Sequence, residues 1–188
     1  MSTANDSKPS VRLRAMEPED LDTLYQMEND VEIWNVGTTN VPYSRYVLHD
    51  YVANVAGDIY TDKQVRLMIE DENGVTVGMV DLVNFSPQHR RAELSIVVKK
   101  EKRRCGFATA AVNQIRKYAL DILHLHQIYV IVDKSNVASV ELFRKMGFRE
   151  QCELADWLFD GKNYKNSIVM QSFREKVFLL FGNKKYYV

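Results

Sequence analysis

The sequence has few cysteines and no excess of either charge. Its 188 residues include 2 Cys, and 25 Lys and Arg balance 25 Asp and Glu. Cys105 and Cys152 provide neither a disulfide framework nor a repeated metal-ligand spacing, so we expect no metal site and a reducing, cytoplasmic compartment. A net charge of zero leaves no global field that favours nucleic acid or an anionic membrane surface, so we expect neither as a partner.

Long apolar runs are also missing. No segment approaches the ~18 apolar residues of a membrane span, and the polar residues 1–10 lack the apolar core of a signal peptide. The 46% of hydrophobic residues is enough for one buried core. A length of 188 residues suits a single domain. We expect a flexible N-terminus over 1–10, a domain over 11–170 and an apolar C-terminal extension over 171–188.

Hydrophobic periodicity predicts an α/β fold. Alternating or unbroken apolar runs indicate strands over 11–14, 65–70, 75–85, 92–99, 128–132, 148–159 and 164–171. Helical spacing indicates helices from Glu17, over 43–55, over 106–123 and over 136–146. The stretches 71–74 and 160–163 carry the Gly and Asn of hairpin turns.

Residues 101–111 join an alternating strand to a long helix through small residues. Gly106 and Ala108 leave the backbone accessible, and the free N–H groups of a helix start favour an anion. Arg103 and Arg104 add two permanent charges. The stretch therefore predicts a phosphate site, although a generic strand-to-helix connection has the same features.

Two motifs in order resemble those of the GCN5-related N-acetyltransferase (GNAT) family. The pattern Arg103-x-x-Gly106-x-Ala108 resembles its acyl-CoA pyrophosphate loop. A second CoA-contacting segment of the family resembles Asn136-x-x-Ser139-x-x-Leu142-Phe143-x-Lys145-x-Gly147-Phe148. The resemblance implies a mixed sheet flanked by helices, with acyl-CoA in the splay between the two central parallel strands.

The resemblance also implies acetyl-CoA as co-substrate and a set of residues that bind it. In the family the pantetheine arm pairs with exposed backbone groups of the strand before the loop, much as a peptide adds to a sheet edge. The implied contacts are Ile96, Val97, Val98, Arg103, Arg104, Cys105, Gly106, Phe107, Ala108, Thr109, Asn136, Ser139 and Lys145.

Glu93, at the start of that strand, is the candidate general base or the carboxylate that attracts a cationic amine. Its alternative is a surface ion pair with Arg90 or Arg91. A primary ammonium has a pKa of ~10.4, so roughly one molecule in a thousand is nucleophilic at neutral pH. A general base typically contributes ~10²–10⁴-fold to such a reaction.

Within the family the chain most resembles bacterial spermidine N-acetyltransferases, through residues 89–93, 132–136 and 160–166. The implied substrate-binding carboxylates are Glu32, Asp81 and Glu93. Phe143 stands where those enzymes carry a tyrosine proposed to protonate the leaving thiolate, and residues 35–40 hold no charge where they carry acids.

Several assignments stay open. Tyr129 and Tyr164 are alternative phenols for the acid role or core residues. Cys105, at a helix N-terminus, is a candidate nucleophile, but no histidine partner is evident nearby in the sequence. Asn136 suits a helix N-cap as well as a contact with CoA. The leading function is acetylation of a primary amine, with a polyamine such as spermidine as substrate. A protein N-terminal acetyltransferase and a non-catalytic acyl-CoA or polyamine sensor are the alternatives, and relatives together with the apolar C-terminal extension suggest a homo-oligomer.

Overall fold

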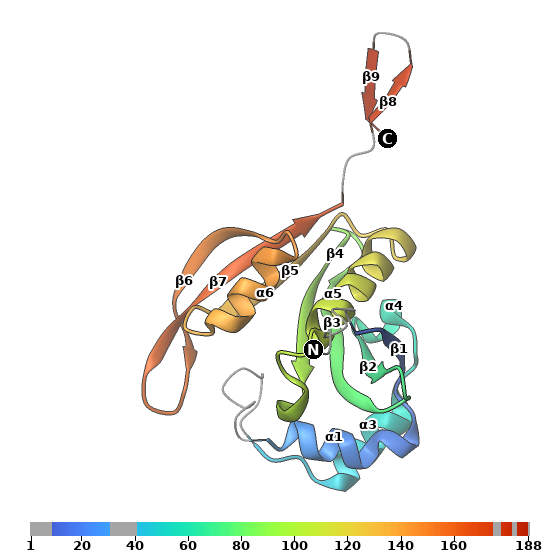
Figure 1. Cartoon of the computed structure of the whole chain (residues 1–188), viewed down its shortest axis with the longest axis vertical. Coiled ribbons are helices and arrows are strands. Elements are labelled where there is room, and N and C mark those ends of the chain that lie inside the picture. Colours follow the sequence, from blue (N-terminus) through green and yellow to red (C-terminus); the bar gives the residue numbers. More distant parts are fainter. Residues whose placement is uncertain (1–8, 31–40, 175–177, 182–183, 188) are drawn as a thin grey trace, which may run out of the picture.

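Seven strands form one mixed sheet in the order β1-β2-β3-β4-β5-β7-β6, as the computed structural model shows (Figure 1). The structure describes residues 9–30, 41–174, 178–181 and 184–187. The strands of the sheet are β1 (Val11–Ala15), β2 (Val65–Asp71), β3 (Thr76–Ser86), β4 (Arg91–Val98), β5 (Gln127–Asp133), β6 (Arg149–Phe159) and β7 (Tyr164–Phe173). Two further strands, β8 (Phe178–Phe181) and β9 (Lys184–Tyr187), pair only with each other.

The described helices fall close to the predicted ranges, except for the short helix α4, which was not predicted. They are α1 (Leu21–Glu28), α3 (Arg45–Asn54), α4 (Ile59–Asp62), α5 (Phe107–Lys117) and α6 (Val137–Lys145), with 3-10 turns η1 (Pro18–Asp20) and η2 (Lys100–Lys102). The helix predicted over 106–123 changes form after Lys117, where η3 (Tyr118–Ile122) is a π-helical turn. None of the described helices is long and apolar enough to cross a membrane.

The two predicted turns are confirmed. Between β2 and β3, Gly74 has φ +75° and Asp71 Oδ1 accepts hydrogen bonds from the backbone of Asn73 and Val75 at 3.0 Å. Between β6 and β7, the N–H of Asp160 donates to the carbonyl of Asn163 at 3.1 Å. Asn and Gly tolerate the left-handed backbone that these turns need.

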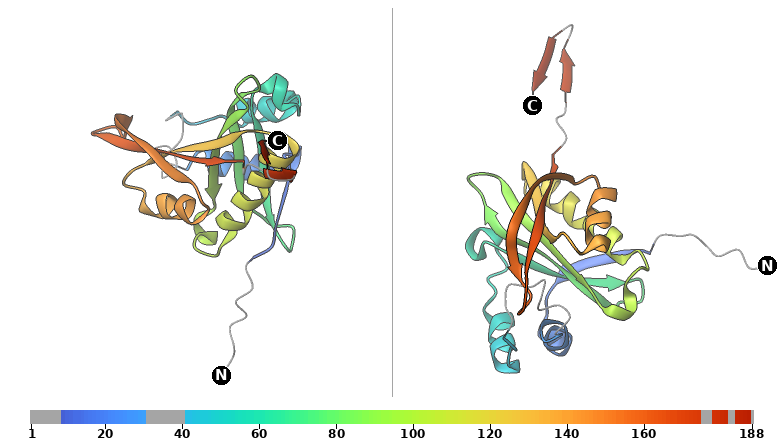
Figure 2. Two further views of the ribbon diagram at one scale, coloured as in Figure 1. Left: turned by 90° about the horizontal axis from the view of Figure 1, so that it is seen from above. Right: turned by 90° about the vertical axis from the view of Figure 1, so that its left-hand side faces the viewer.

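Helices cover both faces of the sheet. Helices α5 and α6 bury Ala111, Val112, Ile115, Val140 and Phe143 in a core with residues of β3, β4 and β5. A second cluster on the other face joins α1 and α3 to β2 and β3 through Leu24, Met27, Leu48, Met68 and Met79. Figure 2 shows these helix pairs in separate parts of the molecule. The predicted α/β sheet flanked by helices is confirmed.

Two patterns are interpreted wrongly from the sequence. The helical spacing of Tyr43, Tyr46, Val47 and Tyr51 predicts that these residues share the apolar face of α3, yet Tyr46 and Val47 are 80% and 48% exposed, and Leu48 is the buried residue of the helix. The unbroken apolar run 128–132 predicts a buried strand, but along this run of β5 Ile128, Val130 and Val132 are buried while Tyr129 and Ile131 are half-buried. The second face of β5 is only partly covered because the core cluster of α1 and α3 packs against β2, β3 and β4 and includes no residue of β5.

An ion-pair network ties β1 to β2 and to the start of α1. Arg14 lies between Asp20 and Glu70, with N–O distances of 2.5 Å to each. Asp20 is only 5% exposed, and it also accepts the backbone N–H of Glu17 at 2.9 Å. The hydrogen bond from Arg14 holds the pKa of Asp20 below its ordinary value, although burial opposes this.

We expect Asp20→Asn to lower the free energy of unfolding at pH 7 by about 1.5–3 kcal/mol, because it removes a charge-assisted hydrogen bond. Since folding lowers the pKa of Asp20, its stabilising effect is full above the unfolded pKa of ~3.9 and is lost as the pH falls below that value. Urea unfolding from pH 7 to pH 2 should show the difference shrinking. Asp22→Asn, at a side chain 73% exposed, is the control, and an equal effect of both would contradict the assignment.

Candidate active site

The two central parallel strands pair over a short distance and then separate. Strand β4 pairs with β5 at Arg91 with Gln127, Ala92 with Ile128 and Glu93 with Tyr129, and at no later residue of either strand. Beyond that point β4 continues to pair with β3, and β5 with β7. The backbone edges that face each other across the gap are therefore outside the sheet's pairing. This is the splay that the GNAT resemblance implied.

The direction of the backbone groups decides which residues of β4 face the splay. The N–H of Lys99 donates to Val77 on β3 at 2.9 Å. Because N–H and C=O directions alternate along a strand, Val97 also faces β3, whereas Ile96 and Val98 face the gap. The expected backbone contact of Val97 with pantetheine is therefore not supported, and its side chain packs in the second core cluster instead. Ile96 and Val98 remain suited to pair with the arm, although the carbonyl of Val98 already accepts from Arg103 Nε at 3.1 Å.

The loop from β4 into α5 has the backbone shape of an anion cradle. Arg104 and Gly106 have φ values of +61° and +87°, and Gly106 is the N-cap of α5. A Cβ at Gly106 would lie 2.9 Å from Cδ of Pro9, so the position has room only for hydrogen. Alternating left- and right-handed residues turn successive N–H groups toward one point, where they bind anions. Phe107, Ala108 and Thr109 form the first turn of α5.

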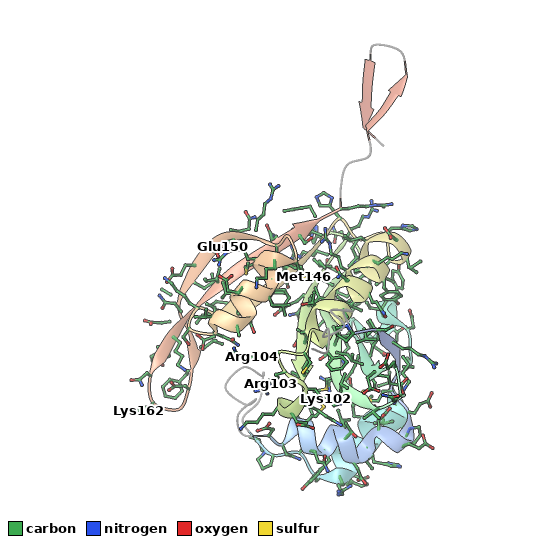
Figure 3. All side chains as sticks on the ribbon, in the orientation of Figure 1. Lys102, Arg103, Arg104, Met146, Glu150 and Lys162 are labelled. Atoms are coloured by element: carbon green, nitrogen blue, oxygen red, sulfur yellow. The ribbon has the colours of Figure 1, made fainter. Side chains whose placement is uncertain are left out.

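Basic side chains surround this loop. Figure 3 shows Lys102, Arg103 and Arg104 grouped where the chain leaves β4. Arg104 and Cys105 are exposed, and the Cys105 thiol donates only to the carbonyl of Arg103 at 3.4 Å. The loop could therefore hold the two negative charges of a pyrophosphate.

The start of α6 lies at the carboxyl end of β5. Oδ1 of Asn136 accepts the N–H of Ser139 at 3.1 Å, so the N-cap interpretation of Asn136 is confirmed. Ser139 is half-buried, and Lys145 is exposed in the last turn of α6. Their contacts with acetyl-CoA stay a prediction.

Glu93 lies at the last paired position before the splay, beside two polar side chains. Nδ2 of Asn84 donates to Oε2 of Glu93 at 2.9 Å, and Tyr129 is directly opposite Glu93 on β5. Burial raises the pKa of the Tyr129 phenol, and the Glu93 carboxylate raises it further. The phenol therefore keeps its proton at neutral pH. No ion pair joins Glu93 to Arg90 or Arg91 in the described part of the chain, since Arg90 donates to the carbonyl of His124.

Asn84 is a site residue that the sequence did not reveal. A β-bulge shifts the pairing of β3 with β4 between Val83 and Ser86, and Asn84 within it has φ +51°. Bulges of this kind re-aim a side chain and are frequent beside active sites. An asparagine just before Phe85-Ser86-Pro87 has the signature of an ordinary turn, so no sequence signal distinguishes it.

The structure does not support Asp81 as a substrate-binding carboxylate, and it does not describe Glu32. Both oxygens of Asp81 accept from Arg66, at 2.9 and 2.8 Å, and Asp81 is 8% exposed. A carboxylate already occupied by a guanidinium is a poor ligand for a substrate ammonium, so that role for Asp81 is wrong in this structure. Glu32 and the uncharged stretch 35–40 lie outside the described residues.

Phe143 is a core residue on α6. It is 4% exposed, and its ring centroid lies 5.2 Å from that of Phe148. A phenyl ring has no proton to give. Phe143 was named as a catalytic residue only because it stands at the position of the family's tyrosine. Elsewhere, Tyr164 is 67% exposed on β7, and no group of three or more His, Cys, Asp or Glu in the described residues could hold a metal ion.

We expect Gly106→Val to abolish acetyl-CoA binding, because a branched side chain at φ +87° strains the loop and collides with Pro9. Gly57→Val is the matched control: Gly57 has φ +71°, and nothing lies within 4 Å of its added Cβ. Calorimetric titration with CoA, alongside thermal melting of both variants, checks this. CoA binding by a folded Gly106→Val as tight as that of the parent would refute the cradle.

Known proteins with the same fold and similar sequences were found by comparison. The Acetyltransferase (GNAT) domain family matches residues 10–149. Spermidine N(1)-acetyltransferase of Escherichia coli (strain K12) is 32% identical over 174 residues, covering 90% of this chain and 89% of that protein. The corresponding Vibrio cholerae protein is 29% identical over 163 residues, covering 85% of this chain and 92% of its own length.

The crystal structure of spermidine N-acetyltransferase from Vibrio cholerae in complex with CoA and spermine superposes with a TM-score of 0.78 at 28% identity, covering 88% of this chain and 96% of that chain. The family match over residues 10–149 contains β1 to β5, the helices α1 and α3 to α6, and the loop before α5. A family match over residues 10–149 and a splayed sheet that ends in an anion loop lead to one conclusion: the chain belongs to the GNAT acetyltransferase family.

Proposed function

We propose that this acetyltransferase moves the acetyl group of acetyl-CoA to a primary amine of a polyamine such as spermidine. Similarity to spermidine N-acetyltransferases along nearly the whole chain supports the substrate class. The observation that carries the chemistry is the placement of Glu93, with Asn84 and Tyr129, at the point where β4 and β5 part.

Acetyl-CoA would be held by the loop at Arg103–Thr109 and by backbone groups of Ile96 and Val98. When bound, its thioester supplies the acetyl group at the splay. The N-terminus of α5 and the arginines would neutralise the phosphates of acetyl-CoA. Because the phosphates are held at the loop, the arm that carries the thioester would lie in the gap between β4 and β5, which ends at Glu93.

Glu93 accepts a proton from the substrate ammonium, directly or through one water, and so frees the nitrogen lone pair. The amide of Asn84 keeps one carboxylate oxygen oriented. As the new C–N bond forms at the acetyl carbon and the C–S bond breaks, the electron pair of that bond stays on sulfur. Tyr129, protonated at neutral pH, donates its proton to the thiolate. It takes the role of the tyrosine that the related enzymes carry at the position of Phe143.

The chain is further proposed to act as a homo-oligomer in the cytoplasm. Both cysteines are free and exposed, which fits a reducing compartment. The domain is proposed to span 11–170, with β7 continuing to Phe173 before the C-terminal extension.

The sensor alternative differs from an enzyme in one measurable way. Phe143 favours the sensor, because a phenyl ring stands where the resembling enzymes carry the tyrosine proposed to protonate the leaving thiolate. A sensor binds CoA but releases no free thiol in the presence of any amine. A thiol-release assay across polyamines, amino acids and N-terminal peptides therefore separates the polyamine enzyme, the protein N-terminal enzyme and the sensor.

We expect Tyr129→Phe to lower kcat by about 100-fold at neutral pH, the lower end of the ~10²–10⁴-fold that a general acid or base typically contributes. CoA affinity should stay unchanged, since the loop is untouched. Phe143→Tyr in the same background should recover part of the loss if its hydroxyl reaches the thiolate. Single-turnover thiol release checks both variants, and an unchanged kcat in Tyr129→Phe would assign proton donation to water.

We expect Glu93→Gln to reduce kcat/KM for spermidine by about 10- to 100-fold, since a charge-assisted hydrogen bond contributes ~1.5–3 kcal/mol. With Asp81 held by Arg66, Glu93 carries most of the recognition of the amine. The exposed Glu19→Gln is the matched control.

Spermidine should also be acetylated with a higher kcat/KM than a monoamine of similar length, because the Glu93 carboxylate attracts a multiply charged amine more strongly than a singly charged one. The same assay, run with both amines, measures this. Equal values for spermidine and the monoamine would move the substrate away from polyamines while leaving acetyl transfer intact.

A further inference from the structure

A large hollow lies at the amino end of β5, away from the anion loop. It has a volume of about 680 Å³, within the range of small-molecule sites. It is formed by the last turn of α5, the residues just before β5 and at the start of β6, and the end of β7. Four of its lining residues carry or can carry positive charge: Arg116, His126, Arg149 and Arg174.

The charge of this hollow, which we call the basic hollow, is uncompensated. Its remaining lining residues are Gly147, Gln171, Ser172 and Phe173, so no Asp or Glu of the described chain lines it. None of its three arginines has a carboxylate partner among the described residues. By contrast, Arg14, Arg45, Arg66 and Arg144 each form an ion pair with a carboxylate.

Although the net charge of the chain is zero, positive charge is concentrated in the basic hollow. Like charges that converge without a counter-ion repel one another, and this costs stability. An anion that bridges the guanidinium groups removes the repulsion and makes charge-assisted hydrogen bonds to planar donors.

One of the arginines is held in place. Nη1 of Arg116 donates to the carbonyl of Met146 at 2.9 Å, which fixes a half-buried guanidinium at the wall of the hollow. Arg149 and Arg174 are exposed and stand at the ends of β6 and β7. The site therefore combines one positioned donor with two adjustable ones.

The basic hollow is separate from the loop that we assign to acetyl-CoA. Arg116 is ten residues beyond Gly106 on α5, which corresponds to about 15 Å along the helix axis at 1.5 Å per residue. Figure 3 likewise places Met146, whose carbonyl holds Arg116, well apart from Arg103 and Arg104.

We propose that the basic hollow binds a polyphosphate anion, independently of acetyl-CoA. A multiply charged phosphate presents enough oxygens to engage all three guanidinium groups. Phe173 is 40% exposed beside His126, with ring centroids 5.6 Å apart, so a nucleotide base attached to the phosphates would have an aromatic surface to contact.

Calorimetric titration with inorganic tripolyphosphate, on protein saturated with CoA, tests this site. We expect binding that weakens as salt rises. Arg149→Gln and Arg174→Gln should each reduce affinity by about tenfold or more, since each removes a charge-assisted contact. Arg12→Gln removes the same charge from an exposed position on β1 and should change nothing.

A second titration with ATP identifies the source of the phosphates. Tighter binding of ATP that is lost in Phe173→Ala assigns a nucleotide, and equal binding of both probes assigns the phosphate chain alone. Three results would overturn the proposal: no tripolyphosphate binding once CoA is saturating, equal losses in Arg12→Gln, or a changed sedimentation coefficient in the arginine variants, which would make the hollow a subunit contact.

Discussion

The divergence of β4 from β5 is the constraint on which the candidate site depends. Two parallel strands that pair at three positions and then part leave their facing backbone groups outside the sheet. Such groups need hydrogen-bond partners, and an extended amide-containing ligand can provide them. The same divergence places Glu93 and Tyr129, the last paired residues, at the mouth of the gap.

The hydrogen-bond partners of Asp81 and Glu93 give these two carboxylates different roles. Asp81 belongs to an ion-pair group in which Arg66 also contacts Glu28, so it ties α1 to β2 and β3. Removing either partner would leave a buried charge uncompensated. Glu93 has only neutral donors next to it, Asn84 and Tyr129, which orient the carboxylate without cancelling its charge. A cationic amine entering the site would therefore be attracted to Glu93 rather than to Asp81.

Features encoded locally could be predicted from the sequence, and features that depend on distant contacts could not. The left-handed turns at Gly74 and Gly106 need glycine for steric reasons, so one residue type predicts them. The N-cap at Asn136 is equally local. The Arg66 to Asp81 pair joins neighbouring strands, and Asn84 is aimed by a bulge whose existence depends on β4. Tyr46 was misjudged because helical spacing does not reveal which face meets the sheet.

Pro9 borders the cradle, since its ring is the nearest neighbour of a side chain added at Gly106. The chain thus enters the fold against the loop assigned to the phosphates, two residues before β1 begins. A different residue in place of Pro9, or residues inserted directly before it, would therefore change the surroundings of the loop assigned to the phosphates.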